Sequence, residues 1–173
     1  LIEATHSGGE MTLKWYPLRP TLWDSLNTIG YTITRWELNA QNQPMVNTKT
    51  TLTGGTGIMP IRPKSEQWFK ENGGGGAGYL EAVGAVLYDS TFQFPKNDLL
   101  DATEMRYSYL ILEAQFPDNF AAEGLGLLYK DDGMTDGLRY RYEVSAMQNG
   151  QTLVSALIDM DSESGIWRSS DEK

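Results

Sequence analysis

The order of the hydrophobic patterns along the chain is the feature that most restricts its fold. Residues 11–53 and 127–160 contain segments in which apolar and polar side chains alternate, the two-residue period of half-buried strands. Between them, residues 58–124 carry apolar side chains at three- and four-residue steps, the period of amphipathic helices. Single strands alternating with single helices would predict a parallel sheet. A block of helices between two blocks of strands instead predicts a mainly β domain with an α insertion.

Particular positions define the strand blocks. Their apolar members occupy every second position: Met11, Leu13 and Trp15; Tyr31 and Ile33; Tyr140, Tyr142, Val144 and Ala146. Asn149-Gly150 is a strong hairpin signal, and residues 153–160 are expected to form the return strand. Residues 23–30 show no such period and are expected to form a loop. The polar residues 161–173 are expected to be a tail or linker.

The helical block carries its own start signals. Asp101 and Glu104 have the spacing of a capping box, in which each side chain satisfies a free amide of the first turn. Ser65 is placed to cap an earlier helix. Gly73–Gly76 lacks the Lys and Ser/Thr that follow a phosphate-binding loop, so a flexible connector is expected. The side chains expected to face the sheet lie on helical stripes: Leu80, Val83, Leu87, Met105, Tyr109 and Leu112.

Three motifs resemble those of the fibronectin type III family. Met134 precedes Tyr140 by six positions, as in the turn before that family's sixth strand, where the tyrosine hydroxyl bonds the turn backbone. Leu13-Lys14-Trp15 resembles its second-strand Leu-x-Trp, whose Trp lies in the core. Gly30-Tyr31-Thr32-Ile33 resembles the start of its third strand.

The resemblance implies an antiparallel β-sandwich. Such a sandwich needs about 100 residues, so about 70 of the 173 residues are surplus. The surplus coincides with the helical block. We therefore expect one fibronectin type III-like domain over residues 1–160, in which residues 58–124 form a mostly helical insertion between the third and sixth strands.

Composition excludes several classes of function. The chain has 14 Lys+Arg and 23 Asp+Glu, a net charge of −9, which argues against a nucleic-acid partner. It has no Cys and a single histidine, His6, so disulfides, thiolate metal sites and multi-His zinc sites are excluded. No apolar run approaches the roughly 20 residues of a membrane helix, so no membrane insertion is expected. The chain begins at Leu1 with no visible signal peptide, and we expect a piece of a longer protein.

The acidic segments raise the question of a metal site. Asp159, Asp161 and Glu163 alternate, and Asp131, Asp132 and Asp136 cluster with two glycines. Neither segment has the complete pattern of a calcium loop, so these acids are expected to be solvated turn residues and no functional metal is expected. Nothing singles out a catalytic pair or triad among the carboxylates and His6. We therefore expect no enzyme activity and no cofactor.

Aromatic side chains are the remaining candidates for binding. Trp23 is expected in a loop, and Trp36 is expected to point away from the core because Tyr31 and Ile33 point into it. The helical insertion is expected to pack over this sheet and bury Trp36. Tyr79 and Tyr107 lie off the helical stripes and are the candidates for exposed contacts. Exposed aromatic rings stack on sugars or anchor protein interfaces.

The leading functional expectation is a non-catalytic structural or protein-interaction module of a larger extracellular or cell-surface protein of bacterial origin. Its partners would be neighbouring domains or other proteins. The second expectation is a carbohydrate-binding accessory domain that uses the aromatic residues on glycans. The third is a hydrolase whose site lies between sandwich and insertion. The leading expectation rests on the family resemblance and on the missing catalytic set, so it depends in part on analogy.

Overall fold

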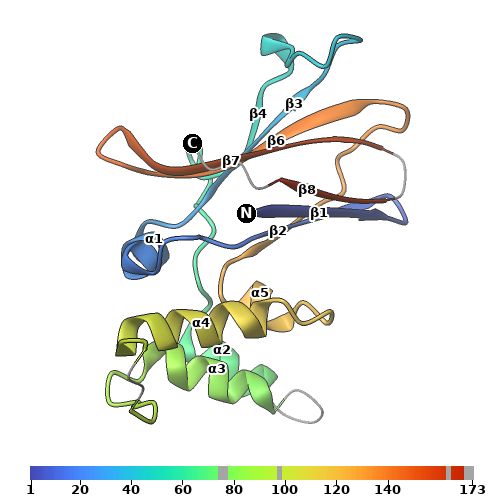
Figure 1. Ribbon diagram of the computed structural model, residues 1–173. Helices are drawn as coiled ribbons and strands as arrows, with labels where there is room; N and C mark the ends of the chain where they lie inside the picture. The colour runs from blue at the N-terminus through green and yellow to red at the C-terminus, as the bar shows by residue number, and fades with distance from the viewer. Residues whose placement is uncertain (74–77, 97–98, 163–164, 170–173) are drawn as a thin grey trace.

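The structure, a computed structural model, describes residues 1–73, 78–96, 99–162 and 165–169. Its strands form two antiparallel sheets of four strands each (Figure 1). The first, in the order β5-β2-β1-β8, contains β1 (Ile2–Ser7), β2 (Glu10–Trp15), β5 (Leu128–Asp131) and β8 (Gly165–Ser169). The second, in the order β4-β3-β6-β7, contains β3 (Thr32–Glu37), β4 (Thr50–Thr53), β6 (Arg139–Gln148) and β7 (Gln151–Asp161).

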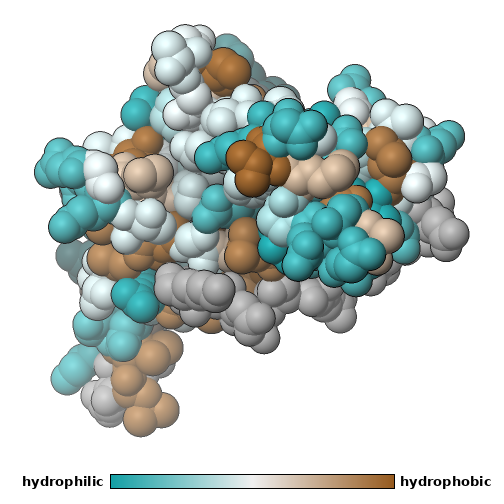
Figure 2. Space-filling view, turned by 90° about the horizontal axis from the view of Figure 1, so that it is seen from above, coloured by the Kyte–Doolittle hydropathy of each residue, from teal (hydrophilic) through white to brown (hydrophobic). Residues whose placement is uncertain are grey.

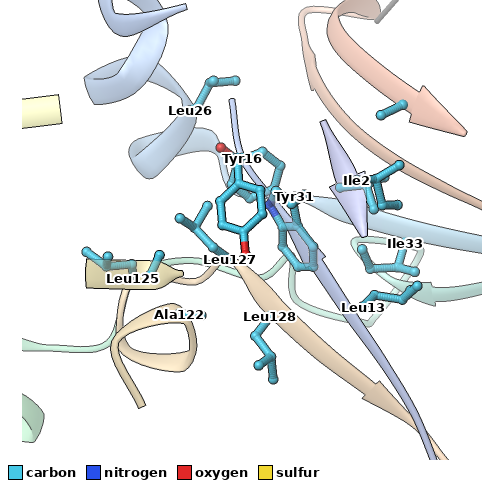
Figure 3. Packing of buried hydrophobic residues seen from close by; sticks show 14 of the residues in the cluster. Ile2, Leu13, Tyr16, Leu26, Tyr31, Ile33, Ala122, Leu125, Leu127 and Leu128 are labelled. Carbon is cyan, nitrogen blue, oxygen red and sulfur yellow. The ribbon is translucent and has the colours of Figure 1, made fainter. Parts of the chain in front are cut away.

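One hydrophobic core includes residues of both sheets and of the helices. Ile2 and Leu13 of the first sheet lie close to Ile33 of the second (Figure 3). Trp15 and Tyr140 are 3% and 2% exposed, so the prediction that both are buried is confirmed. The hairpin expected at Asn149-Gly150 is present between β6 and β7.

Helices occupy the connection between β4 and β5, as the periodicity predicts. They are α2 (Glu66–Asn72), α3 (Tyr79–Tyr88), α4 (Ala102–Ala114) and α5 (Phe120–Gly124). They form one group beside the first sheet (Figure 1). Both predicted caps are present: the Trp68 N–H donates to Ser65 Oγ at 3.3 Å, and Asp101 and Glu104 form the complete capping box. Two short 3₁₀ helices, η1 (Pro20–Leu22) and η2 (Val46–Thr48), lie in other connections.

Residues 23–30 are not a loop. They form α1 (Trp23–Ile29), which ends at Gly30 in a left-handed conformation with φ of 82°. Trp23 and Leu26 lie three positions apart on one face and are 2% and 0% exposed. The loop prediction is wrong. A helix of seven residues, about two turns, with two buried residues is too short to show a helical period in the sequence.

The expected polar tail at residues 161–173 is also corrected. β7 continues to Asp161, and β8 pairs antiparallel with β1 from Ile2 opposite Ser169 to His6 opposite Gly165. Without β8, β1 would be an edge strand with a row of unpaired backbone groups. The polar composition of the segment did not reveal this backbone pairing. Glu163 and residues 74–77, which include most of the expected glycine connector, lie outside the described residues.

The inward face of the helices differs in part from the expected one. Leu80 and Val83 are fully buried, as predicted. Leu112, however, is 60% exposed, and Leu110 and Ala114 are buried in its place. Leu110 and Ala114 are four positions apart and share one helix face, so α4 is rotated relative to the expected stripe. The other expected inward residues are half-buried: Leu87, Met105 and Tyr109.

Candidate functional site

An extended segment, residues 60–64, joins the sheets to the helices. The backbones of Ile61 and Tyr31 exchange hydrogen bonds of 2.8 and 2.9 Å, so the segment begins beside the start of β3. The Lys64 N–H donates to the Gly124 carbonyl at 2.8 Å, which attaches its other end to α5. Prolines at 60 and 63 favour an extended backbone between them. The segment therefore fixes the position of Arg62 between the sheets and the helices.

Two glycines allow Arg62 its place. A Cβ at Gly30 would lie 2.7 Å from Arg62 Cγ, and one at Gly126 would lie 2.5 Å from the Arg62 carbonyl carbon. Both glycines have left-handed φ angles, 82° and 67°, which other residues rarely adopt. The Arg62 Nε donates to the Ile29 carbonyl at 3.2 Å, at the negative end of α1. The guanidinium group is thereby held against the end of α1.

Two cavities lie between α1 and the helical insertion. One has a volume of about 610 Å³ and the other about 380 Å³. Trp23, Asp24 and Arg106 line both, so the two cavities adjoin and are called the α1 cleft below. Small-molecule sites commonly have volumes of about 300–1,000 Å³. The α1 cleft is therefore large enough for a small ligand or for part of a polymer.

One face of α1 supplies a wall of the cleft. Trp23, Asp24, Asn27 and Thr28 all line the smaller cavity, as expected for residues one helical turn apart. Among the described residues, the indole N–H of Trp23 and the side-chain oxygen of Asn27 have no hydrogen-bond partner. Buried polar groups nearly always have one. The wall therefore contains one unsatisfied donor and one unsatisfied acceptor on the same helix face.

Two arginines from different elements line the smaller cavity. They are Arg62 of the extended segment and Arg106 of α4. A guanidinium nitrogen of Arg106 donates to the Asp89 carbonyl at 3.2 Å. Hydrogen bonds from Thr91 lower the pKa of Asp89, and the charge of Arg106 contributes to the same shift. Each arginine donates to a backbone carbonyl, and within the described residues neither forms an ion pair.

Aromatic rings form other parts of the cleft wall. Phe92 and Phe94 line the larger cavity and contact each other edge to face, with ring centroids 5.1 Å apart. Tyr88 lines the smaller cavity and is 41% exposed. Its hydroxyl donates to the Lys64 carbonyl, and burial raises its pKa. The cleft thus combines aromatic faces and two guanidinium groups, and two unsatisfied polar atoms lie covered within its α1 wall.

A buried polar cluster lies elsewhere, between the two sheets. Asp131 of β5 is 4% exposed, and its Oδ2 accepts hydrogen bonds from Arg35 of β3 at 2.6 Å and Tyr142 of β6 at 2.7 Å. Its Oδ1 accepts from the Gly133 N–H at 2.8 Å. Asp131 is thus not the solvated turn acid that the sequence predicted. Both of its oxygens already bond groups of the protein, so the cluster fastens one sheet to the other.

The electrostatics of this cluster follow from its burial. Burial raises the pKa of the Tyr142 phenol, and the hydrogen bond to the negative Asp131 raises it further. Burial by itself would lower the pKa of Arg35, but the attraction to Asp131 and the interactions with Asp131 and Tyr142 together outweigh it, so the pKa is raised. Arg35 also lies over the ring of Tyr140, 5.1 Å from its centroid. Arg35 therefore stays charged and Tyr142 stays protonated over the pH range in which proteins fold.

Two of the four predicted binding residues meet in the structure. Trp23 and Tyr107 contact each other edge to face, with ring centroids 5.9 Å apart. Trp23 is buried at the cleft wall, so the prediction of an exposed loop tryptophan is wrong. Tyr107 is half-buried, and its hydroxyl donates to the Pro17 carbonyl. Tyr107 therefore packs behind Trp23 and does not present the exposed surface that its sequence position suggested.

The other two predicted residues lie apart from the cleft. Tyr79 on α3 is half-buried, and its hydroxyl lies 2.6 and 2.7 Å from the two carboxylate oxygens of Asp118. Burial, and then this hydrogen bond, raises the pKa of Tyr79. Trp36 on β3 is half-buried, with the Lys49 ammonium 5.5 Å from its ring centroid. The end of β3 points away from α2–α5 (Figure 1), so the expected packing of these helices over the outer face of this sheet is not met.

Sequence reasoning did not identify Asn27, Arg62 or Arg106. The Pro-Ile-Arg-Pro stretch signals an extended backbone around Arg62, but not what its side chain meets. Asn27 and Arg106 are ordinary polar residues of helices. Their roles arise only because α1 and α4, which are far apart in the sequence, form opposite parts of one cleft.

Over residues 1–73, 78–96, 99–162 and 165–169, no group of three or more His, Asp or Glu side chains is arranged to hold a metal ion. In the same part of the chain, no helix has the length and apolar character to cross a membrane. Compared with protein-family models, with curated proteins and with solved structures, the chain matches none.

Proposed function

We propose that this chain is a non-catalytic binding module of a larger extracellular or cell-surface protein, built on a fibronectin type III-like sandwich. Two features support the sandwich. The Thr135 N–H donates to the Tyr140 hydroxyl at 2.9 Å, which is the tyrosine-to-turn bond that the resemblance implies. Trp15 on β2 and Tyr31 at the start of β3 are both in the core, with ring centroids 5.3 Å apart.

In this proposal the sheets are the rigid body and the helical insertion is the binding part. The observation that carries the proposal is the α1 cleft, which lies where the insertion meets α1. The buried Asp131 cluster fastens the two sheets and leaves its own oxygens no further role. On the face seen in Figure 2, the coloured hydrophobic residues occur in separate groups between hydrophilic ones.

A carbohydrate-binding accessory domain is the form of this function that the cleft composition favours. Sugar sites combine aromatic faces with hydrogen-bonding side chains. The α1 cleft has both, with exposed rings from Phe92 and Tyr88 and polar side chains from Asn27 and Arg106. A module that binds neighbouring protein domains would use the same cleft to bind a polar loop of such a domain.

The test measures binding and turnover on the same preparation. The purified chain is applied to a glycan array and titrated against the flanking domains of its parent protein. It is also incubated with a panel of chromogenic hydrolase substrates. We expect saturable binding to a glycan or a flanking domain and no turnover. Turnover lost on changing Asp24 and Asp101, which line the larger cavity, would show an enzyme instead. Binding to neither class of partner would also refute the proposal.

A further inference from the structure

We propose that the α1 cleft binds an acidic sugar unit, with Arg62 and Arg106 on its carboxylate and Trp23 and Asn27 beside a ring hydroxyl. The inference rests on the proposal that this cleft is a binding site, and adds the chemistry of the ligand.

The two arginines point to an anionic group. Guanidinium groups bind planar carboxylates with paired hydrogen bonds. The smaller cavity is lined by two arginines against one carboxylate, Asp24, so its formal charge is positive, 2 − 1 = +1, in a chain whose net charge is −9. Each arginine uses one nitrogen on a backbone carbonyl, and the other nitrogens are not engaged by carboxylates of the described residues. Backbone anchoring fixes the cations in place without neutralising them.

The α1 wall points to a hydroxyl group. The Trp23 indole N–H is a donor only, and the Asn27 side-chain oxygen is an acceptor only. A hydroxyl group of a ligand can accept from the Trp23 N–H and donate to the Asn27 oxygen at the same time. A carboxylate can only accept. Both atoms are covered by neighbouring groups, so we expect Asn27 to change its rotamer as the ligand enters. Asp24 adds a second acceptor for hydroxyl groups.

The remaining wall suits a sugar ring. Tyr88 presents a partly exposed ring to the smaller cavity, and sugar faces stack on such rings. The larger cavity continues past Arg106 toward Phe92, so an oligosaccharide could extend from the acidic unit into it. An inorganic anion would use the arginines but neither the aromatic ring nor the α1 wall.

The experiment compares matched ligands by isothermal titration calorimetry. The probes are tri-galacturonate, its fully methyl-esterified form, in which a neutral methyl ester replaces each carboxylate, and inorganic phosphate. Tri-galacturonate is expected to bind, and the ester to bind at least about tenfold more weakly, as for the loss of a hydrogen bond to a charged group. NMR spectra provide a second measurement. The indole N–H resonance of Trp23 is assigned from its absence in Trp23→Phe, and it is expected to shift when tri-galacturonate is added.

Variants that remove one positive charge distinguish binding in the cleft from a general effect of the protein's charge. Arg62→Gln and Arg106→Gln are each expected to weaken tri-galacturonate binding about tenfold or more. Lys70→Gln is the control, because it makes the same charge change on the exposed face of α2, outside the cleft. It is expected to leave the affinity unchanged. Melting curves of all variants show whether each is folded. Arg→Lys at both positions keeps the charge but removes the paired hydrogen bonds of the guanidinium group.

Four outcomes would overturn the inference. They are no binding of tri-galacturonate, equal binding of acid and ester, equal affinity in the folded Arg62→Gln and Arg106→Gln variants, and phosphate binding that matches that of the sugar. If tri-galacturonate fails but a flanking domain or a neutral glycan binds, the inference is wrong while the proposed binding module stands.

Discussion

Replacement of Asp131 by Asn tests whether the buried cluster fastens the two sheets. The change removes the negative charge opposite Arg35, whose side chain is only 16% exposed. Breaking a buried ion pair from one side costs about 3–5 kcal/mol. In this variant Arg35 keeps some exposure to solvent and its contact with the ring of Tyr140. We therefore expect a cost at the lower end of this range, about 3 kcal/mol. For a chain of this length that lowers Tm by roughly 6–12 °C.

The chain contains a matched control for this change. Arg141 and Asp159 form an ion pair across β6 and β7 at 2.6 Å, and their side chains are 26% and 35% exposed. Asp159→Asn makes the same substitution at a more solvated pair and is expected to cost about 0.2–1 kcal/mol. Urea unfolding followed by circular dichroism measures both free energies.

A double-mutant cycle separates the pair from its surroundings. Arg35→Met and Asp131→Asn are combined, and the double variant is expected to be less destabilised than the sum of the singles by about 2 kcal/mol. Tyr142→Phe removes the second donor to Asp131 and is expected to cost about 1.5 kcal/mol. The reasoning fails if Asp131→Asn costs no more than Asp159→Asn, or if the two changes at the pair are additive.

Further predictions concern the core, the cleft and ionisation. Trp15→Ala should cost about 3–5 kcal/mol, and Tyr140→Phe about 1 kcal/mol through its lost turn bond; parent-like melting of both would show that the strand alignment is wrong. Gly30→Ala should lower Tm and displace Arg62, which the loss of tri-galacturonate binding would report. Burial raises the pKa of Glu113 in the folded protein, so folding favours the protonated carboxyl. This contribution to stability is lost as pH rises through the folded pKa. Glu113→Gln should therefore melt above the parent at pH 7, by less than about 1 kcal/mol, with no gain at low pH. EDTA and calcium should leave Tm unchanged, and a rise of several degrees with calcium would indicate a metal site.

Much of the secondary structure could be predicted from the sequence because its signals are local. The strands from Met11 to Trp15 and from Tyr140 to Ala146 follow from alternation, and the start of α4 follows from the capping box of Asp101 and Glu104. These signals act over two to four residues. Where the local signal was weak the prediction failed: β1 was missed because its buried positions include an alanine and a histidine, and α1 was missed because it is short.

The candidate site could not be predicted from local patterns. The Arg35–Asp131 pair joins residues 96 positions apart, and nothing near Asp131 distinguishes it from the solvated acids of other turns. Trp23 was selected for its residue type, but it is buried and packs against Tyr107, 84 positions later, since 107 − 23 = 84. The sequence by itself therefore determined where strands and helices begin, through periodicity and capping. Only the tertiary structure decided which charges are buried and which arginines share a cleft, because burial and electrostatics depend on neighbours that the chain brings together by folding.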